Sequence, residues 1–320
     1  MPRLADMATS WAWHRVMTAF VLPTPDVRDV RYGIAYMCAA VLIFSLVNAL
    51  AKWLTQGYPV TEIAFFRCVF ALLPCLYLVM THGGLNALRT KRIGWHMSRA
   101  VLQFASMTCM FAAFALMPLA DAVAISFSLP LFITALSVPM LGEKVGIFRW
   151  GAVIVGFIGV LVMVQPGPGV FESGALFVLA NSIMGAVLSL AIRRMSLTES
   201  PTALTTYQIG FATLLSIAFL PFGWTTPSLL DFCMLAALGL GSGIGQFWWT
   251  QAMRLAPAAV AAPFQYTAMI WAMILGFLIW SDLPTPTLLS GAAIVVASGL
   301  FILYRETIRR ARPTPATQGD

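Results

Sequence analysis

The sequence predicts an all-α integral membrane protein of ten transmembrane helices, built as two inverted repeats of five helices. Composition, the length of the apolar runs and an internal similarity between the two halves lead to this prediction. Of the 320 residues, 60% are hydrophobic and 10% are charged, whereas soluble domains carry about 25% charged residues. So few charges cannot form a water-facing surface, so most of the chain must face lipid or other helices.

The apolar runs are long enough to cross a bilayer, which takes roughly 20 residues in a helix. Glycine, proline or charged residues separate the runs, as in turns. Because the runs are solidly apolar rather than alternating, they favour a helical bundle over a β-barrel. The predicted spans are residues 32–52, 60–80, 95–116, 121–141, 148–165, 173–192, 203–222, 229–252, 258–280 and 286–304.

The distribution of basic residues predicts that both termini are cytoplasmic. With the N-terminus inside, 16 of the 19 Lys and Arg residues fall in inside segments, where such residues accumulate. Lys52 alone falls in an outside loop, while Arg67 and Arg99 fall within spans. The predicted cytoplasmic segments are residues 1–31 and 307–320. The aromatic residues of the first segment suit it to the membrane surface. The net charge of +7 then reflects the inside loops, and we expect the lipid bilayer rather than nucleic acid as partner.

Residues 117–160 and 253–300 are similar to one another. Because five helices is an odd number, a second copy must enter the membrane from the opposite side. Inverted repeats that meet near the midplane are the architecture of secondary transporters. We therefore divide the spanning region into repeats 32–167 and 168–306. The matched positions are Leu119-Ala120 with Leu255-Ala256, Phe127 with Phe264, Gly142-Glu143 with Ser281-Asp282, and Gly151 and Gly159 with Gly291 and Gly299.

With these repeats, the sequence resembles the EamA family of the drug/metabolite transporter superfamily. The resemblance rests on Ala64-Phe65-Phe66-Arg67 and on residues 122–167 and 261–306, and it extends over residues 31–306. It implies a secondary active or facilitative carrier that moves a small organic metabolite across the inner membrane by alternating access.

Three segments, AFFR, VAISFSLPLF and FRWGAVIVGFIGV, resemble carriers for S-adenosylmethionine uptake within that family. S-adenosylmethionine or a related zwitterion is therefore the expected substrate. An exporter of amino acids or other metabolites and a riboflavin carrier are the alternatives. The direction of transport, the coupling ion and the oligomeric state stay open.

Arg67 is the most informative candidate substrate-binding residue. It lies about two turns into the second span, where a charge is costly and indicates function. Its guanidinium can hold a carboxylate or phosphate by two parallel hydrogen bonds. Alternatively, it reaches the interface or bonds helix-end carbonyls. Arg99 lies about a turn inside the third span, and we expect it to extend to the interface.

Further candidates are polar and aromatic residues on the first, third, fourth, sixth, eighth and ninth helices, which the family resemblance implies line the cavity. In lipid such groups turn inward or bond across helices, so each alone is also compatible with a structural role. Tyr266 and Trp271 offer ring faces for stacking or a cation–π contact. These candidate substrate-binding residues are Asn48, Gln103, Ser126, Asn181, Gln246, Gln265, Tyr266 and Trp271.

Acidic residues are missing from the middle of every predicted span. A proton-coupled exporter of cationic drugs needs a buried carboxylate there, so the sequence argues against that class. Lys52 and Glu62 flank the first outer loop and are a candidate gate or coupling pair. The alternative is a solvated surface pair of little energetic consequence.

Other function classes find little support. A phosphate-binding GxxxxGK[ST] motif is absent, which excludes an ATPase on this chain, and neither a mid-span aspartate pair nor a serine–histidine pair indicates an enzyme. The five cysteines form no CxxC or Cys/His cluster, so we expect no metal, cofactor or disulfide. A pore is the third class, but inverted repeats and helices interrupted by proline fit alternating access better.

Glycines and prolines within the spans predict close packing and bends. Gly239, Gly241, Gly243 and Gly245 fill the eighth span, and small residues at such spacing let helices approach closely. Pro130 and Pro263 interrupt the fourth and ninth spans. Interrupted helices at equivalent places in two repeats indicate a binding site, with a static kink as the alternative.

Overall fold

A computed structural model describes residues 27–81, 88–90, 92–142, 145–165, 173–195, 199, 201–256 and 258–311. Most of the predicted N-terminal cytoplasmic segment lies outside these residues, as do Glu143 and Glu172. The remaining part of that segment, from Val27, belongs to the first helix. The first helix therefore starts five residues earlier than predicted.

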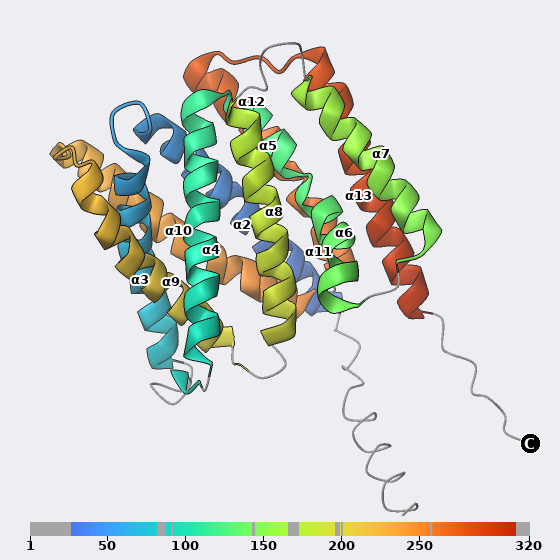
Figure 1. Cartoon of the computed structure of the whole chain (residues 1–320), viewed down its shortest axis with the longest axis horizontal. Helices are drawn as coiled ribbons and strands as arrows, with labels where there is room; N and C mark the ends of the chain where they lie inside the picture. Colours follow the sequence, from blue (N-terminus) through green and yellow to red (C-terminus); the bar gives the residue numbers. More distant parts are fainter. Residues whose placement is uncertain are drawn as a thin grey trace, which may run out of the picture.

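The described residues contain ten helical spans that are long and apolar enough to cross a membrane, and this confirms the predicted fold class (Figure 1). Eight spans are single helices, and the fourth and ninth are each divided into two. The helices are α2 (Val27–Leu54), α3 (Val60–Thr81), α4 (Ile93–Leu116), α5 (Leu119–Ser126), α6 (Leu129–Leu141), α7 (Ile147–Val164), α8 (Ser173–Met195), α9 (Pro201–Phe219), α10 (Leu229–Leu255), α11 (Ala258–Gln265), α12 (Thr267–Trp280) and α13 (Pro286–Ala311), with a short 3-10 helix η2 (Leu220–Phe222) after α9.

The predicted bends at Pro130 and Pro263 are short breaks in the helical hydrogen bonding. Pro130 stands in the first turn of α6 and Pro263 lies inside α11. Proline has no N–H, so each removes one bond of the helical ladder. At the breaks the chain makes tighter turns, in which Ser128 N–H donates to Ile125 O at 3.0 Å and Tyr266 N–H donates to Pro263 O at 3.2 Å. The two broken spans meet where the rings of Phe127 and Tyr266 lie 5.1 Å apart.

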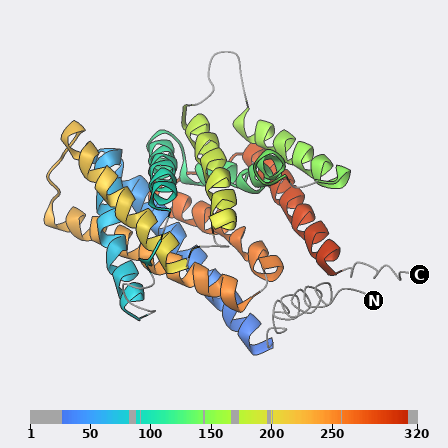
Figure 2. The same ribbon diagram turned by 60° about the horizontal axis from the view of Figure 1, so that its bottom comes forward.

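The helix contacts are symmetric between the two halves. In the first half α3 packs on α10 and α2 packs on α10; in the second half α9 packs on α4 and α8 packs on α4 in the same way. The equivalent helices α3 and α9 contact each other, as do α7 and α13. Figure 2 shows α3, α9 and α10 together on one side of the bundle and α7 beside α13 on the other. The first two helices of each half thus pack on the third helix of the other half, which is the arrangement that two inverted five-helix repeats produce.

The backbone confirms the sequence match between Gly142 and Ser281. Both residues end the second half of a broken helix in the left-handed conformation, with φ of 67° at Gly142 and 58° at Ser281. In each case the backbone N–H donates to the carbonyl four residues earlier, which satisfies a helix-end acceptor. Equivalent positions in the two repeats therefore carry the same helix cap, although only one of them is glycine.

The glycines of α10 confirm the close packing that their spacing predicts. A Cβ atom at Gly243 would lie 2.7 Å from Pro74 of α3, and one at Gly245 would lie 2.8 Å from Ile43 of α2. Gly239 likewise meets α3 and Gly241 meets α2. The alternating glycines thus let α10 pack tightly between α2 and α3, which places the polar side chains of α10 and α3 beside one another.

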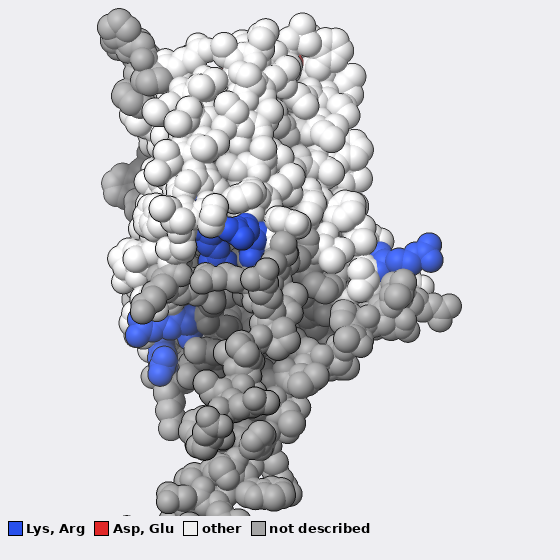
Figure 3. All heavy atoms as spheres, turned by 90° about the vertical axis from the view of Figure 1, so that its right-hand side faces the viewer, with Lys and Arg blue, Asp and Glu red and all other residues white. Residues whose placement is uncertain are grey.

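Basic residues gather at one end of the bundle. Arg31 lies near the start of α2, Arg92 just precedes α4, and Arg305 lies near the end of α13. On the face in Figure 3, the visible Lys and Arg side chains lie toward the end where α13 finishes, and the described surface above them is almost free of charge. We call this end the basic end and the opposite one the Lys52 end. That the basic end faces the cytoplasm stays a prediction.

Candidate functional site

A cavity with a volume of about 360 Å³ lies between α3, α4, α9 and α10, with the end of α8 at its side. Ligand pockets for small molecules typically start near 300 Å³. Its deep part is lined by Arg67, Met107 and Ser242 near the middle of their helices. It continues toward the basic end, where Ile192 and Thr250 line it near the ends of α8 and α10. The full lining is Arg67, Cys68, Ala71, Arg99, Gln103, Met107, Ile192, Leu204, Thr205, Gln208, Ile209, Ala212, Ser242, Gln246 and Thr250.

Arg67 enters this cavity from α3 and rests on uncharged groups. Its Nε donates to Ser242 Oγ at 3.0 Å, its Nη1 contacts the sulfur of Met107, and its guanidinium carbon lies 5.8 Å from the ring centre of Phe111. That ring lies within the roughly 6 Å range of a cation–π contact. Among the described residues, no carboxylate pairs with Arg67. The guanidinium is therefore held in place from three sides without its charge being neutralised.

Arg99 lines the same cavity, contrary to our expectation that it extends to the interface. Its side chain is buried, with 4% exposed, because its Nη2 donates to Leu204 O at 2.9 Å and to Gln208 Oε1. The amide of Gln208 in turn donates to Gln103 Oε1 at 2.9 Å. A chain of polar groups thus connects α4 to α9 along the cavity wall. Nε and Nη1 of Arg99 are buried and have no hydrogen-bond partner in the described part of the chain.

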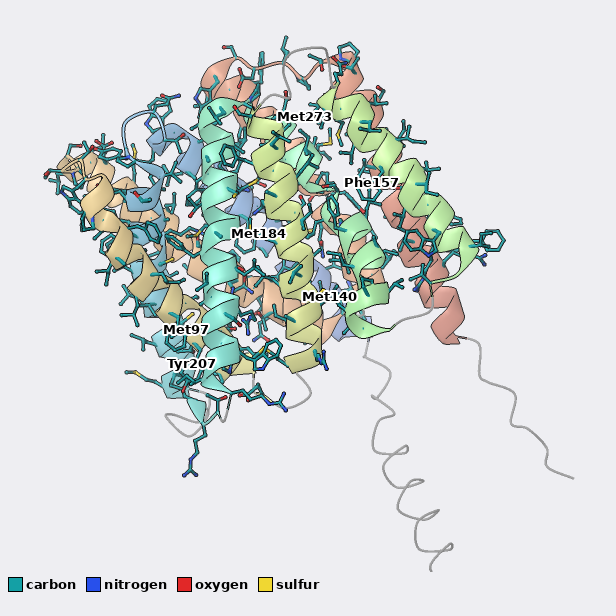
Figure 4. All side chains as sticks on the ribbon, in the orientation of Figure 1. Met97, Met140, Phe157, Met184, Tyr207 and Met273 are labelled. Carbon is teal, nitrogen blue, oxygen red and sulfur yellow. The ribbon has the colours of Figure 1, made fainter. Side chains whose placement is uncertain are left out.

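A second polar cluster lies beside Arg99 at the basic end. His96 Nε2 lies 3.5 Å from Glu199 Oε2, and Glu199 Oε1 accepts a hydrogen bond from Thr90 at 3.0 Å. Tyr207, which Figure 4 labels at this end near Met97, donates to Leu88 O at 2.8 Å. The carboxylate of Glu199 is thus engaged by His96 and Thr90 and makes no ion pair with Arg99.

The Lys52 end is tied together by contacts between several helices. Lys52 Nζ donates to Met117 O at 2.7 Å, lies 3.9 Å from Asp282 Oδ2 and sits 5.1 Å from the ring centre of Trp280. These contacts join the end of α2 to the ends of α4 and α12. Lys52 and Glu62 do not pair with each other, because Lys52 turns toward Asp282.

Glu62 and Tyr58 connect the same end to the segment before α10. Glu62 is fully buried, and its Oε2 accepts a hydrogen bond from the Thr225 N–H at 2.9 Å. The Tyr58 hydroxyl donates to Asp231 Oδ2 at 2.7 Å, and this bond raises the pKa of Tyr58 above its ordinary value. Glu62 is therefore not part of a solvated surface pair, which corrects that alternative.

Of the nine predicted substrate-binding residues, the cavity brings together Arg67, Gln103 and Gln246. The other six lie outside its lining. Asn181 bonds across helices instead, donating to Ser106 O at 2.8 Å, and Ser126 donates to Val123 O at 2.6 Å. Trp271 packs against a buried cluster between α2 and the end of α10, formed by Met37, Val41, Ala252 and Ala256. Tyr266 packs on Phe127, and Asn48 and Gln265 are half-buried on α2 and at the end of α11.

The cavity lining also includes three residues that were not predicted from the sequence as site residues, namely Arg99, Gln208 and Ser242. The family resemblance pointed to helices other than α3 and α9 as the main cavity walls, whereas both form walls of this cavity. An available signal was the amide of Gln208 within an apolar span, because such groups turn inward in lipid.

Comparisons with known proteins identify the relatives of this chain. The model of the EamA-like transporter family matches residues 31–165 and 172–304. The chain is 30% identical over 274 residues to an S-adenosylmethionine uptake transporter of Rickettsia felis, covering 86% of this chain and 93% of that protein. It is 28% identical over 284 residues to a riboflavin transporter of Vibrio cholerae, covering 88% and 95% respectively.

A solved crystal structure of another protein shares the fold. It superposes with a TM-score of 0.61 at 20% sequence identity and covers 88% of this chain and 99% of its own. At that identity the likeness concerns the fold alone.

Proposed function

Because this chain belongs to the EamA-like transporter family, we propose that it moves a small organic metabolite across the bacterial inner membrane by alternating access. The cavity between α3, α4, α9 and α10 is the proposed substrate site. The chain is a multi-pass membrane protein and a transporter rather than an enzyme, in agreement with its relatives. The division into repeats 32–167 and 168–306 follows the two family matches closely and remains our proposal for the domain boundaries.

The observation that carries this proposal is Arg67, a guanidinium without a carboxylate partner among the described residues, in a cavity inside the bundle. Burying an unpaired charge costs several kcal/mol, and a substrate carboxylate would offset that cost with two charge-assisted hydrogen bonds. Gln103 and Gln246 add donors and acceptors that can orient the rest of the substrate. A carboxylate-bearing metabolite is therefore the substrate class that this site supports best.

S-adenosylmethionine is the first substrate to test, because it carries a carboxylate and is the named substrate of a relative. Riboflavin is the second, because it is the named substrate of another relative. The two differ usefully, since riboflavin has no carboxylate. Tyr266 and Trp271, which we expected to contact a substrate ring, do not line this cavity. Any role that they have in substrate binding would therefore belong to another state of the transport cycle.

The contacts at the Lys52 end, together with a cavity that extends toward the basic end, support a state that is accessible from the basic end. If that end is cytoplasmic, as the charge distribution predicts, this state faces inward. We propose the contacts of Lys52 and Glu62 as the outer gate of the cycle.

The test is uptake of labelled S-adenosylmethionine and of riboflavin into proteoliposomes, with thermal stabilisation of the detergent-purified protein as a binding measurement. A ligand at a hundredfold excess over its dissociation constant stabilises by about 2.7 kcal/mol. We expect saturable uptake of one carboxylate-bearing metabolite, lost in Arg67→Gln. The matched control is Arg305→Gln, since Arg305 lies on α13 against Phe148, outside the cavity lining. Undiminished uptake in Arg67→Gln would rule out this assignment of Arg67.

A further inference from the structure

The charge of the cavity lining is unbalanced. Among the described residues, its two charged side chains are Arg67 and Arg99, and neither forms an ion pair. In the cluster beside the cavity, the carboxylate of Glu199 lies 3.5 Å from His96 and accepts a hydrogen bond from Thr90. Two cationic groups therefore face one cavity inside a low-dielectric bundle, where each unpaired charge is costly.

Both guanidiniums keep hydrogen-bonding capacity for a ligand. Each guanidinium has five N–H donors in a fixed fork. Arg99 uses Nη2 for Leu204 and Gln208, while its Nε and Nη1 are buried and find no hydrogen-bond partner among the described residues. Arg67 is supported by a hydroxyl, a thioether and a ring, none of which carries a negative charge. Fully buried donors such as those of Arg99 are normally satisfied, and a ligand anion would supply a partner that the described residues do not.

The spacing of the two arginines follows from α4. Arg99, Gln103 and Met107 recur every fourth residue and so share one face of the helix, and Met107 contacts Arg67. Eight residues of helix rise about 12 Å. Gln103 and Gln208 lie between the two ends and join the cavity wall by their hydrogen bond. The site therefore offers two cationic ends separated by a polar middle section.

We infer that this cavity binds an organic anion with two acidic groups, one held by Arg67 and the other by Arg99. This inference rests on the proposed function and specifies its substrate class. It disfavours both named candidates, because S-adenosylmethionine carries one carboxylate against a sulfonium and an ammonium, and riboflavin has no carboxylate. A molecule of net positive charge would add to the two arginine charges instead of balancing them.

The test compares linear dicarboxylates with their own monoamides, which have the same shape and one charge fewer. Succinate, glutarate, adipate and suberate are titrated against the purified protein, with thermal stabilisation and competition for proteoliposome uptake as readouts. We expect one chain length to bind at least about tenfold more tightly than its monoamide, because charge-assisted hydrogen bonds are about twice as strong as neutral ones. The comparison uses the wild-type protein, so it does not depend on a variant folding.

Two variants then locate the acidic groups. In Arg99→Gln the dicarboxylate should bind no better than its monoamide. In Arg67→Gln the dicarboxylate should likewise lose its advantage over the monoamide. Arg305→Gln should keep the wild-type preference. The inference is overturned if the wild-type protein binds diacid and monoamide alike, or if Arg99→Gln keeps the preference.

The outcomes also separate this inference from the proposed function. Saturable, Arg67-dependent uptake of S-adenosylmethionine without any dicarboxylate binding would overturn the two-acid substrate and leave the carrier and its site intact. Failure of every carboxylate to bind or to be transported would overturn both.

Discussion

Ser281 shows at the scale of one residue how the two repeats differ. It holds a left-handed backbone, with φ of 58°, where the equivalent position of the first repeat has glycine. The left-handed conformation costs a residue with a Cβ roughly 1–2 kcal/mol, whereas glycine adopts it freely. The first repeat therefore ends its broken span without strain, and the second does not.

Replacing Ser281 by glycine should relieve this strain. We expect Ser281→Gly to stabilise the protein by about 1 kcal/mol and Gly142→Ser to destabilise it by a similar amount. The measurement is the apparent melting temperature in detergent, with the two variants serving as each other's control. A lower melting temperature for Ser281→Gly would show that the serine side chain makes a stabilising contact that outweighs the strain.

Arg67 and Arg99 illustrate a different point at the same scale. Sequence alone places both arginines inside apolar spans, where a charge is costly, and it predicts a substrate-binding Arg67 and an Arg99 that extends to the interface. The direction of each side chain in the structure decides between a place in the cavity and an extension to the interface. Arg99 turns into the cavity because Leu204 O and the amide of Gln208 accept its hydrogen bonds, so it does not reach for the interface.

At the scale of the element, α10 depends on its small residues. Gly239 and Gly243 face α3 while Gly241 and Gly245 face α2, so the helix is packed closely on two sides. Helix association in lipid relies on such contacts, because no hydrophobic effect drives it. The same approach brings Ser242 to Arg67, which links the packing of α10 to the site.

Adding a single methyl group tests this packing. A Cβ at Gly243 would lie 2.7 Å from the ring of Pro74, so Gly243→Ala should destabilise the protein by about 1–3 kcal/mol. At Gly210 of α9, such a Cβ would have no atom of the described residues within 4 Å. Gly210→Ala should therefore stabilise by about 0.5–1 kcal/mol, since alanine is the better helix former. Equal effects of the two substitutions on the melting temperature would contradict the close approach of α10 and α3.

For the whole molecule, access to the cavity depends on the contacts that close the Lys52 end. Lys52 bridges the ends of α2, α4 and α12 through Met117 O and Asp282. In alternating access, opening this end must break such contacts, so they favour the state in which it is closed. A ligand or mutation shifts such an equilibrium only by its differential effect on the two states.

Removing the Lys52 contacts should favour opening of this end. In a variant that keeps only Cys68, which lines the cavity, we expect Lys52→Gln to increase labelling by a membrane-impermeant thiol reagent added outside intact cells. A loss of about 1 kcal/mol corresponds to a roughly fivefold increase in rate. Lys52→Arg is the control that keeps the positive charge. Unchanged labelling would exclude Lys52 from the gate. A reporter fused to the C-terminus establishes separately which side of the membrane each end of the bundle faces.

Hydrophobicity and charge along the chain determined the larger features of this protein. Ten spans, two inverted halves and the segregation of basic residues follow from the sequence, because a bilayer requires a continuous apolar helix for each crossing. The match of Gly142 with Ser281 and the packing role of the α10 glycines could also be predicted, since cap geometry and close approach restrict the residue types that fit.

Only the tertiary structure decided which polar residues meet. It joined Arg67, Gln103 and Gln246 in one cavity, added Arg99, Gln208 and Ser242, and left Asn181 and Trp271 in contacts between helices. The physical reason is that a polar side chain in lipid must turn inward, but many inward partners satisfy it equally well. The choice among those partners depends on how each helix is rotated and paired, which contacts far apart in the sequence determine.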